Sequence, residues 1–239
     1  MKTNLFLIFA VLFLFSCSKK DSSSSTSQKP LVKTISFDST VVQSFWYDNQ
    51  GRITCYRTLE SPGIDSTVYF YNSNTLERRL YYNGILSEIE HGTLENGNLV
   101  FMKGIKADSS SFWSTFYTYD GNGFLSREIH MDNDTVETWR VEYQIVDGNL
   151  VSLNRSNYFP FVCTYEYYPG TNNSIRLLPY MFTFMGKTSK NLVKKLTISY
   201  SPGTSIEENY TYEYYENGWV KKLTNIQSTQ TLHIYFTYW

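Results

Sequence analysis

The sequence feature that most restricts the fold is an aromatic unit, ending in a turn, that recurs about every 24 residues. In each unit, aromatic and polar residues alternate up to a tyrosine, and a turn follows. These tyrosines are Tyr47, Tyr71, Tyr119, Tyr168 and Tyr215. Two strands and two turns need about 24 residues, because strands average about 5 to 6 residues and hairpin loops have about 2 to 5. Each unit is therefore one hairpin, and the longer intervals between tyrosines hold two.

Turn chemistry supports the same division into hairpins. Asn83-Gly84, Asp147-Gly148 and Asn217-Gly218 are tight-turn pairs. Asn, Asp and Gly tolerate the positive φ that primed hairpin turns require. The turn missing from the first long interval is expected at residues 95–97, where Glu, Asn and Gly follow one another.

Strand alternation is the only clear periodicity between the turns. Tyr210, Tyr212 and Tyr214 are expected to share one face of a strand, and no convincing apolar period of 3.6 residues occurs. We therefore predict an all-β fold, a single large antiparallel meander of about 14 to 17 strands. Open sheets rarely exceed about 10 strands, so the meander should be strongly curved or barrel-like.

The first 30 residues differ from the rest of the chain. Lys2 precedes an unbroken apolar run at 5–15, and Ser16 and Cys17 follow it. A membrane span needs roughly 20 apolar residues, so this shorter run is typical of a signal peptide. Residues 14–17, Leu-Phe-Ser-Cys, resemble a lipobox. We expect residues 1–16 to be the lipoprotein signal peptide and Cys17 to carry lipid, palmitate included; the alternative is an ordinary signal followed by an incidental cysteine.

Residues 17–30 are predicted to be a Ser-rich tether, and residues 31–239 a single antiparallel β-domain. After Cys17, the stretch 18–30 contains no apolar residue that could enter a core. The lipid on Cys17 would hold the protein, as a monomer, at the outer membrane of the cell envelope. The periplasmic and surface sides of that membrane both stay open.

Charge and cysteine content exclude some classes of partner. The chain has 21 basic and 22 acidic residues and a net charge of −1, which favours neither nucleic acid nor an anionic membrane surface as a partner. Besides Cys17, the chain contains Cys55 and Cys163, both in strand-like runs. We expect both to be free and buried; a disulfide between them is the alternative in an oxidising compartment.

The sequence contains no hydrolase or metal-binding motif. Its three histidines are His91, His130 and His233. They stand far apart and are assigned to ordinary strand positions. Glu88 and Glu90 share a strand face as a glycosidase pair would, but we interpret them as outward glutamates on a solvated face. The Asp-Gly-Asn-Gly run at 120–123 is interpreted as a turn and not as a calcium site. We therefore predict no enzyme activity, no cofactor and no metal.

The turn motifs also carry a resemblance to known proteins. The Tyr-Asp-x-x-Gly turns resemble the YD repeats of bacterial surface proteins. Together with the lipobox, the tether, the Ser-Lys-Asn-Leu segment at 189–192 and the closing aromatic strand, they resemble Bacteroidetes lipoproteins of unknown function. Those proteins are described as having a porin-like fold. The resemblance covers about residues 31–239 and implies a soluble, barrel-like sheet, and it implies no activity.

Two surface features are candidates for modification or binding. Asp followed by Ser or Thr and then a small or apolar residue resembles the O-glycosylation sequon of Bacteroidetes exported proteins. Ser39, Ser66 and Thr135 stand in this pattern and are candidate glycosylation sites, with plain turn chemistry as the alternative. The apolar segment 175–186 breaks the hairpin repeat. We expect it to cover the core, and a ligand or partner surface is the alternative.

The aromatic content suggests a role in binding. Aromatic residues make up 18% of the chain, with 21 tyrosines, and rows of tyrosines offer flat apolar area with a polar handle to sugars or peptides. The same rows could simply form the core. We predict an uncharacterised cell-envelope lipoprotein that is a non-enzymatic binding module for a glycan, a peptide or a partner protein through an aromatic concave face. The alternative is a structural or assembly component of an outer-membrane complex; an enzyme and an integral β-barrel are further alternatives.

Overall fold

The computed structural model describes most of the predicted β-domain. The described residues are 31–38, 40–60, 63–109, 111–133, 135–157, 159–171, 173, 185–200 and 203–239. Residues 1–30, with the predicted signal peptide, Cys17 and the tether, lie outside these ranges, and so does 175–184 of the apolar segment. Met185, at the end of that segment, is buried. Within the described ranges, no helix is long and apolar enough to cross a membrane.

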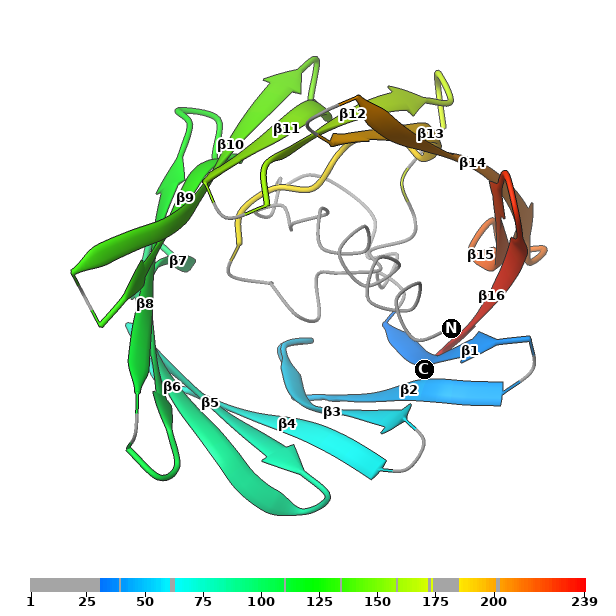
Figure 1. Ribbon diagram of the computed structural model, residues 1–239. Helices are drawn as coiled ribbons and strands as arrows, with labels where there is room; N and C mark the ends of the chain where they lie inside the picture. The colour runs from blue at the N-terminus through cyan, green and yellow to red at the C-terminus, as the bar shows by residue number, and fades with distance from the viewer. Residues whose placement is uncertain are drawn as a thin grey trace.

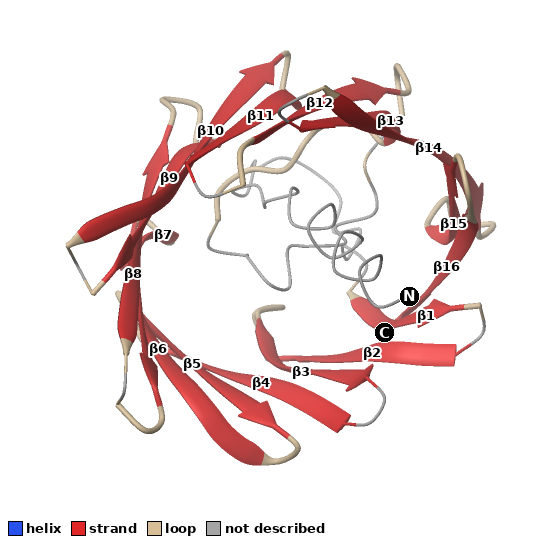
Figure 2. Cartoon of the chain, in the orientation of Figure 1, coloured by secondary structure: helices blue, strands red, loops and turns tan. Residues whose placement is uncertain are grey.

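The described residues form sixteen strands that close into an antiparallel barrel (Figures 1 and 2). The strands are β1 (Val32–Phe37), β2 (Thr40–Tyr47), β3 (Ile53–Glu60), β4 (Gly63–Tyr71), β5 (Thr75–Tyr82), β6 (Ile85–Glu95), β7 (Asn98–Lys106), β8 (Phe112–Tyr119), β9 (Leu125–Asp132), β10 (Val136–Val146), β11 (Asn149–Asn157), β12 (Phe161–Tyr167), β13 (Val193–Tyr200), β14 (Thr204–Tyr214), β15 (Val220–Gln227) and β16 (Thr231–Tyr238). Each strand pairs with its neighbours in the sequence. The predicted all-β meander is confirmed.

The first and last strands close the sheet. In their pairing, Ile35 lies opposite Phe236 and Thr34 lies opposite Thr237. The hydroxyl oxygens of the two threonines are 2.7 Å apart, within hydrogen-bonding distance. Closure leaves no unpaired strand edge, which solves the problem that a meander of this length would otherwise face.

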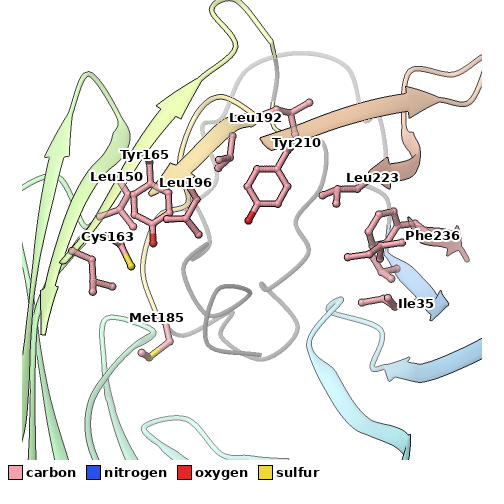
Figure 3. Close-up of a cluster of buried hydrophobic side chains, with 14 of the residues drawn as sticks. Ile35, Leu150, Cys163, Tyr165, Met185, Leu192, Leu196, Tyr210, Leu223 and Phe236 are labelled. Atoms are coloured by element: carbon pink, nitrogen blue, oxygen red, sulfur yellow. The ribbon is translucent and has the colours of Figure 1, made fainter. Parts of the chain in front are cut away.

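The hydrophobic core lines the inner wall of the barrel. Successive side chains of a strand point to opposite faces of the sheet, and the described strands with buried apolar residues, which are all but β6, β8 and β9, turn them toward the inside of the barrel. Figure 3 shows members of this set from β1 and from β11 to β16 pointing into the ring, among them Ile35, Tyr165, Leu196 and Tyr210. Sequence alternation therefore separates an inner wall from an exterior.

One rim of the barrel is held by tyrosines. The turns that follow even-numbered strands all lie at this end, which we call the tyrosine rim, because each hairpin unit returns the chain to the same end. Five tyrosine hydroxyls donate to a backbone carbonyl at the start of the preceding odd-numbered strand, at 2.7 to 2.8 Å. These pairs are Tyr47–Val32, Tyr119–Leu99, Tyr167–Leu150, Tyr212–Val193 and Tyr238–Val220. Much of the tyrosine repeat is therefore structural.

Tight turns connect the strands as predicted at three positions. Asn83-Gly84, Asn96-Gly97 and Asp147-Gly148 each have positive φ at both residues, which is the geometry of a primed turn. At Asn217-Gly218 only the glycine has positive φ. There the N–H of Gly218 donates to the carbonyl oxygen of Tyr215, which makes a longer loop.

The connection from β12 to β13 lies across turns of the tyrosine rim. In its described part, 185–192, the N–H of Lys190 donates to the carbonyl oxygen of Gly148 at 2.8 Å. The side chain of Asn191 accepts a hydrogen bond from the amide of Asn149 at 3.0 Å. The Ser-Lys-Asn-Leu segment thus fastens the β10–β11 turn to the β12–β13 connection.

Candidate ligand-binding site on the inner wall

Six neighbouring side chains near the rim opposite the tyrosine rim form a continuous row on the inner wall, which we call the aromatic ladder. From β8 to β13 its members are Trp113, His130, Trp139, Arg155, Phe161 and Tyr200. The His130 ring stacks on Trp139, with 4.8 Å between centroids and 4° between planes. It also contacts the Trp113 ring, with centroids 5.2 Å apart.

Arg155 continues the ladder across the next two strands. Its Cζ atom lies 5.2 Å from the ring centroid of Trp139 and 5.8 Å from that of Phe161. The Phe161 ring in turn lies 6.0 Å from the Tyr200 ring. Cross-strand pairing explains the order, because His130 is opposite Trp139, and Phe161 is opposite both Arg155 and Tyr200. All six side chains are only partly buried.

The ladder carries little positive charge at its histidine. Burial lowers the pKa of His130, and this effect outweighs the attraction of Asp132. The Nδ1 atom of His130 lies 2.9 Å from the hydroxyl oxygen of Thr115. A neutral imidazole stacked on an indole behaves as part of an apolar platform. The guanidinium of Arg155 supplies the ladder's cation, although burial lowers its pKa from the ordinary value.

A carboxyl group with a raised pKa lies beside the ladder. Glu128 of β9 accepts a hydrogen bond of 2.5 Å from the hydroxyl of Tyr143. Burial raises the pKa of Glu128 to about 7. The Tyr143 hydrogen bond and the charge of Arg155 lower this pKa, but by less than burial raises it. Near neutral pH this group therefore exists in both states, and its protonated form is able to donate a hydrogen bond.

Further acidic groups lie on the inner wall of β6. Arg78 of β5 forms a two-point ion pair with Glu90, with 2.6 Å between Nη2 and Oε1. Burial alone would lower the pKa of Arg78, but Glu90 raises it well above the ordinary value. The indole N–H of Trp113 donates to Glu88. Burial is the main reason why the pKa of Glu88 is raised.

The interpretation of Glu88 and Glu90 as outward, solvated glutamates is wrong. Both project from the inner wall, and Glu90 is 1% exposed. Carboxylates are costly to bury without partners. Here Arg78 forms an ion pair with Glu90, and the indole of Trp113 donates to Glu88, so both carboxylates can lie on the inner wall. Each carboxylate has its own partner, so the two do not form a free acid and base pair.

Glycine at position 104 makes room for this arrangement. A Cβ atom on Gly104 would overlap both the indole of Trp113 and the carboxylate of Glu88. In the strand register, Gly104 lies opposite Glu90 of β6 on one side and opposite Trp113 of β8 on the other. The backbone of β7 is therefore the floor beneath the Trp113 and Glu88 contact.

A second polar cluster lies across the barrel, on β14 and β15. Glu208 is 1% exposed and accepts hydrogen bonds from Tyr210, from Asn225 at 2.9 Å and from Gln227 at 2.9 Å. Nearby, burial raises the pKa of the Cys163 thiol to about 12, with the charge of Glu208 adding to the effect. Sequence reasoning missed this cluster because it joins residues from two strands.

The predicted modification sites lie in different surroundings. Cys17 and Ser39 are outside the described residues. Ser66 lies on the exterior face of β4, opposite Arg57 and Tyr81. Thr135 is exposed in the β9–β10 turn, where its N–H donates to the carbonyl oxygen of Asp132. Lipidation and glycosylation stay predictions.

The cysteines and the Asp-Gly-Asn-Gly run are placed clearly. Cys55 and Cys163 are free, as predicted. Cys163 is buried, whereas Cys55 is only partly buried and lies opposite Trp46 on the exterior. Asp120 accepts hydrogen bonds from the N–H groups of Asn122 and Phe124 at 2.9 and 2.8 Å, so the run is a turn.

The other two histidines lie on the exterior of the barrel. His91 is 3.7 Å from Glu77, and His233 contacts the hydroxyl of Thr224 at 3.1 Å. His130 lies in strand β9, and in the ladder it stands between Trp113 and Trp139. The available signal was that His130 shares its strand face with Glu128, but their neighbours come from strands whose register the sequence does not specify.

Comparisons with known proteins match the architecture. No family model matches the sequence, and no curated protein matches it. The crystal structure of a porin-like protein from Bacteroides uniformis ATCC 8492 has a TM-score of 0.64 and 13% identity, covering 87% of this chain and 96% of the other. A porin-like protein from Bacteroides vulgatus ATCC 8482 has a TM-score of 0.56 and 12% identity, covering 86% and 97%. The chain shares its barrel fold with these porin-like proteins.

Proposed function

We propose that this protein is a non-enzymatic binding protein of the cell envelope that holds a glycan against the aromatic ladder. The observation that carries the proposal is the ladder itself, six partly buried side chains in continuous contact across six strands. Flat rings with exposed area are the surfaces on which sugar rings stack, because both faces are apolar. Barrels of 16 strands are generally wide enough to hold a channel, a plug or a ligand.

Polar groups around the ladder favour a hydroxyl-rich ligand. Glu128 and Arg155 place an acceptor and a donor next to the rings. A few polar groups at the edge of an apolar platform fix the orientation of a ligand. The carboxylates Glu88 and Glu90 are occupied by protein partners, which supports binding in preference to acid–base catalysis.

The envelope location rests on two supports. The fold is shared with porin-like Bacteroides proteins, and the lipobox at residues 14–17 predicts export and lipidation. A lipid-held barrel at the outer membrane is well placed to capture glycans.

Calorimetric titration with a panel of short neutral and acidic oligosaccharides tests the proposal. Replacing Trp139, at the centre of the ladder, by Ala should weaken binding at least about tenfold, or about 1.4 kcal/mol. Trp219→Ala is the matched control, because Trp219 packs on Tyr238 at the tyrosine rim. The proposal fails if no oligosaccharide binds, if a parallel panel of peptides binds instead, or if the two variants bind equally.

A further inference from the structure

The exterior of the barrel is divided into two unlike halves. On β2 to β9, a cross-strand row runs through Trp46, Cys55, Val68, Arg79, Ile89, Ile105 and Phe112. On β10 to β14, a comparable row runs through Gln144, Ser152, Thr164, Thr197 and Glu207. We call the exterior faces of β2–β9 and β10–β16 the apolar flank and the polar flank.

A second row strengthens the apolar flank. Phe101 lies opposite Phe116, and Phe116 lies opposite Ile129. The two phenylalanine rings are in contact, with 5.1 Å between centroids. Across the flank, Trp46 on β2 is 38% exposed, Phe70 on β4 is 47% exposed and Phe116 on β8 is 47% exposed. Large aromatic side chains stay this accessible on a sheet face mainly where another surface covers them.

The two flanks also differ in charge. On the described strands, the apolar flank carries four cations and two carboxylates, a net charge of +2. These are Arg57, Arg79, Lys103, Arg127, Glu77 and Glu95. The polar flank carries five glutamates and five basic residues, a net charge of zero. These are Glu137, Glu142, Glu166, Glu207, Glu213, Arg140, Lys194, Lys195, Lys221 and Lys222.

The cations of the apolar flank lie over its aromatic rings. The guanidinium of Arg79 lies 4.8 Å from the Phe70 ring centroid, and that of Arg57 lies 5.4 Å from that of Trp46. Lys103 lies 4.2 Å from the Phe112 centroid. Long basic side chains that cover apolar rings keep their charge at the edge of an apolar layer, and aromatic rings prefer the same depth of a membrane interface.

We propose that the apolar flank docks on an anionic lipid surface, with the side of the barrel against the headgroups. Charge complementarity selects lipid phosphates over a second copy of this chain, because two such flanks would each bring a net charge of +2. The polar flank, without excess positive charge, stays in water. The proposal is independent of the ladder and of the lipid on Cys17.

Bromolipid quenching of tryptophan fluorescence tests the contact. The full chain is mixed with vesicles of phosphatidylglycerol and phosphatidylcholine that contain brominated acyl chains. Of the five tryptophans, Trp46 lies on the apolar flank. Trp46→Phe should therefore remove most of the bromolipid quenching. Trp219→Phe is the control, because Trp219 packs on Tyr238 at the tyrosine rim, and it should leave the quenching nearly unchanged.

Two double variants, one on each flank, test whether the basic residues of the apolar flank contribute to lipid binding. Arg57→Gln with Arg127→Gln should lower the affinity for anionic vesicles by about fivefold per cation, whereas Lys195→Gln with Lys222→Gln on the polar flank should not. All variants share residues 1–30, so any contact of that region with lipid cancels. Near-ultraviolet circular dichroism verifies the fold of each variant.

Three results would overturn the proposal. The first is quenching that persists in Trp46→Phe, and the second is equal quenching with vesicles of phosphatidylcholine alone. The third is a dimer in sedimentation velocity that the Trp46→Phe change dissociates, which would assign the flank to a second copy of the chain.

Discussion

Replacing Gly104 by Ala should destabilise the barrel by disturbing the contact between Trp113 and Glu88. The new methyl group would overlap both side chains. Overpacking a well-packed site costs about 1 to 3 kcal/mol, and loss of a hydrogen bond to a charged group costs about 1.5 to 3 kcal/mol. Partial relaxation makes the two costs overlap, so we expect a total of about 3 kcal/mol. A domain of about 200 residues would then melt about 6 to 12 °C lower.

Thermal and urea unfolding, followed by tryptophan fluorescence, measure the effect. Gly121→Ala is the matched control, because a Cβ there meets no atom within 4 Å, and it should change stability by less than about 0.5 kcal/mol. A double-mutant cycle adds specificity: in a Trp113→Phe background, Gly104→Ala should cost at least about 1 kcal/mol less. Equal costs for the two glycine variants, or for Gly104→Ala in the two backgrounds, would refute the packing described for β6–β8.

Three further predictions concern the buried acid, the tyrosine rim and the N-terminus. Burial raises the pKa of Glu128 from 4.5 to about 7, so the stabilising contribution of the protonated group is complete below pH 4.5 and declines as the pH rises through 7. Between about pH 5 and pH 8, the free energy of unfolding in urea should fall by about 2.5 kcal/mol more for wild type than for Glu128→Gln. An equal pH dependence of the two unfolding free energies would contradict this. Tyr212→Phe should cost about 1 kcal/mol, because it leaves the carbonyl of Val193 without its hydroxyl partner, whereas Tyr82→Phe, at a residue 54% exposed, should be neutral in the same assay. Cys17→Ser should abolish lipidation and partition with membranes, and normal lipid labelling of the variant would exclude Cys17 as the lipidated residue.

The sequence was sufficient to predict the hairpins and their number, because turn chemistry is local. Asn83-Gly84 and Asp147-Gly148 need positive φ whatever surrounds them, and both adopt it. The tyrosine repeat is also local, because each repeated tyrosine stands directly before a turn at the tyrosine rim. Closure was not predictable, since it depends on the pairing of Ile35 with Phe236, about 200 residues away, and on the summed twist of all the strands.

The candidate site was harder to predict than the fold. A tyrosine-rich concave face was expected, but Tyr47 and Tyr212 use their hydroxyls to hold the rim. The ladder at the other end depends on His130, Trp139 and Arg155, which come from three strands. A shift of one residue in register would place any of these side chains on the exterior. Their contact therefore cannot be predicted without knowing the strand register. Glu88 was misplaced for the same reason.

The exterior was predicted only in part. Alternation of aromatic and polar residues along single strands predicts a polar, solvated face, and the polar flank fits this. The row from Trp46 to Phe112 does not, because its residues are separated by turns and bulges, such as the register shift between Trp46 and Tyr47. A sequence window within one strand does not reveal that neighbouring strands contribute apolar residues to the same surface.

The central claim is that the aromatic ladder is a ligand-binding surface, and the indole N–H resonances of the five tryptophans test it most directly. Titration of ¹⁵N-labelled protein with a binding oligosaccharide should shift or broaden the Trp113 and Trp139 signals, and leave those of Trp219 and Trp239 in place. Shifts confined to Trp219 and Trp239 would contradict the account, and so would unchanged signals in all five under saturating oligosaccharide.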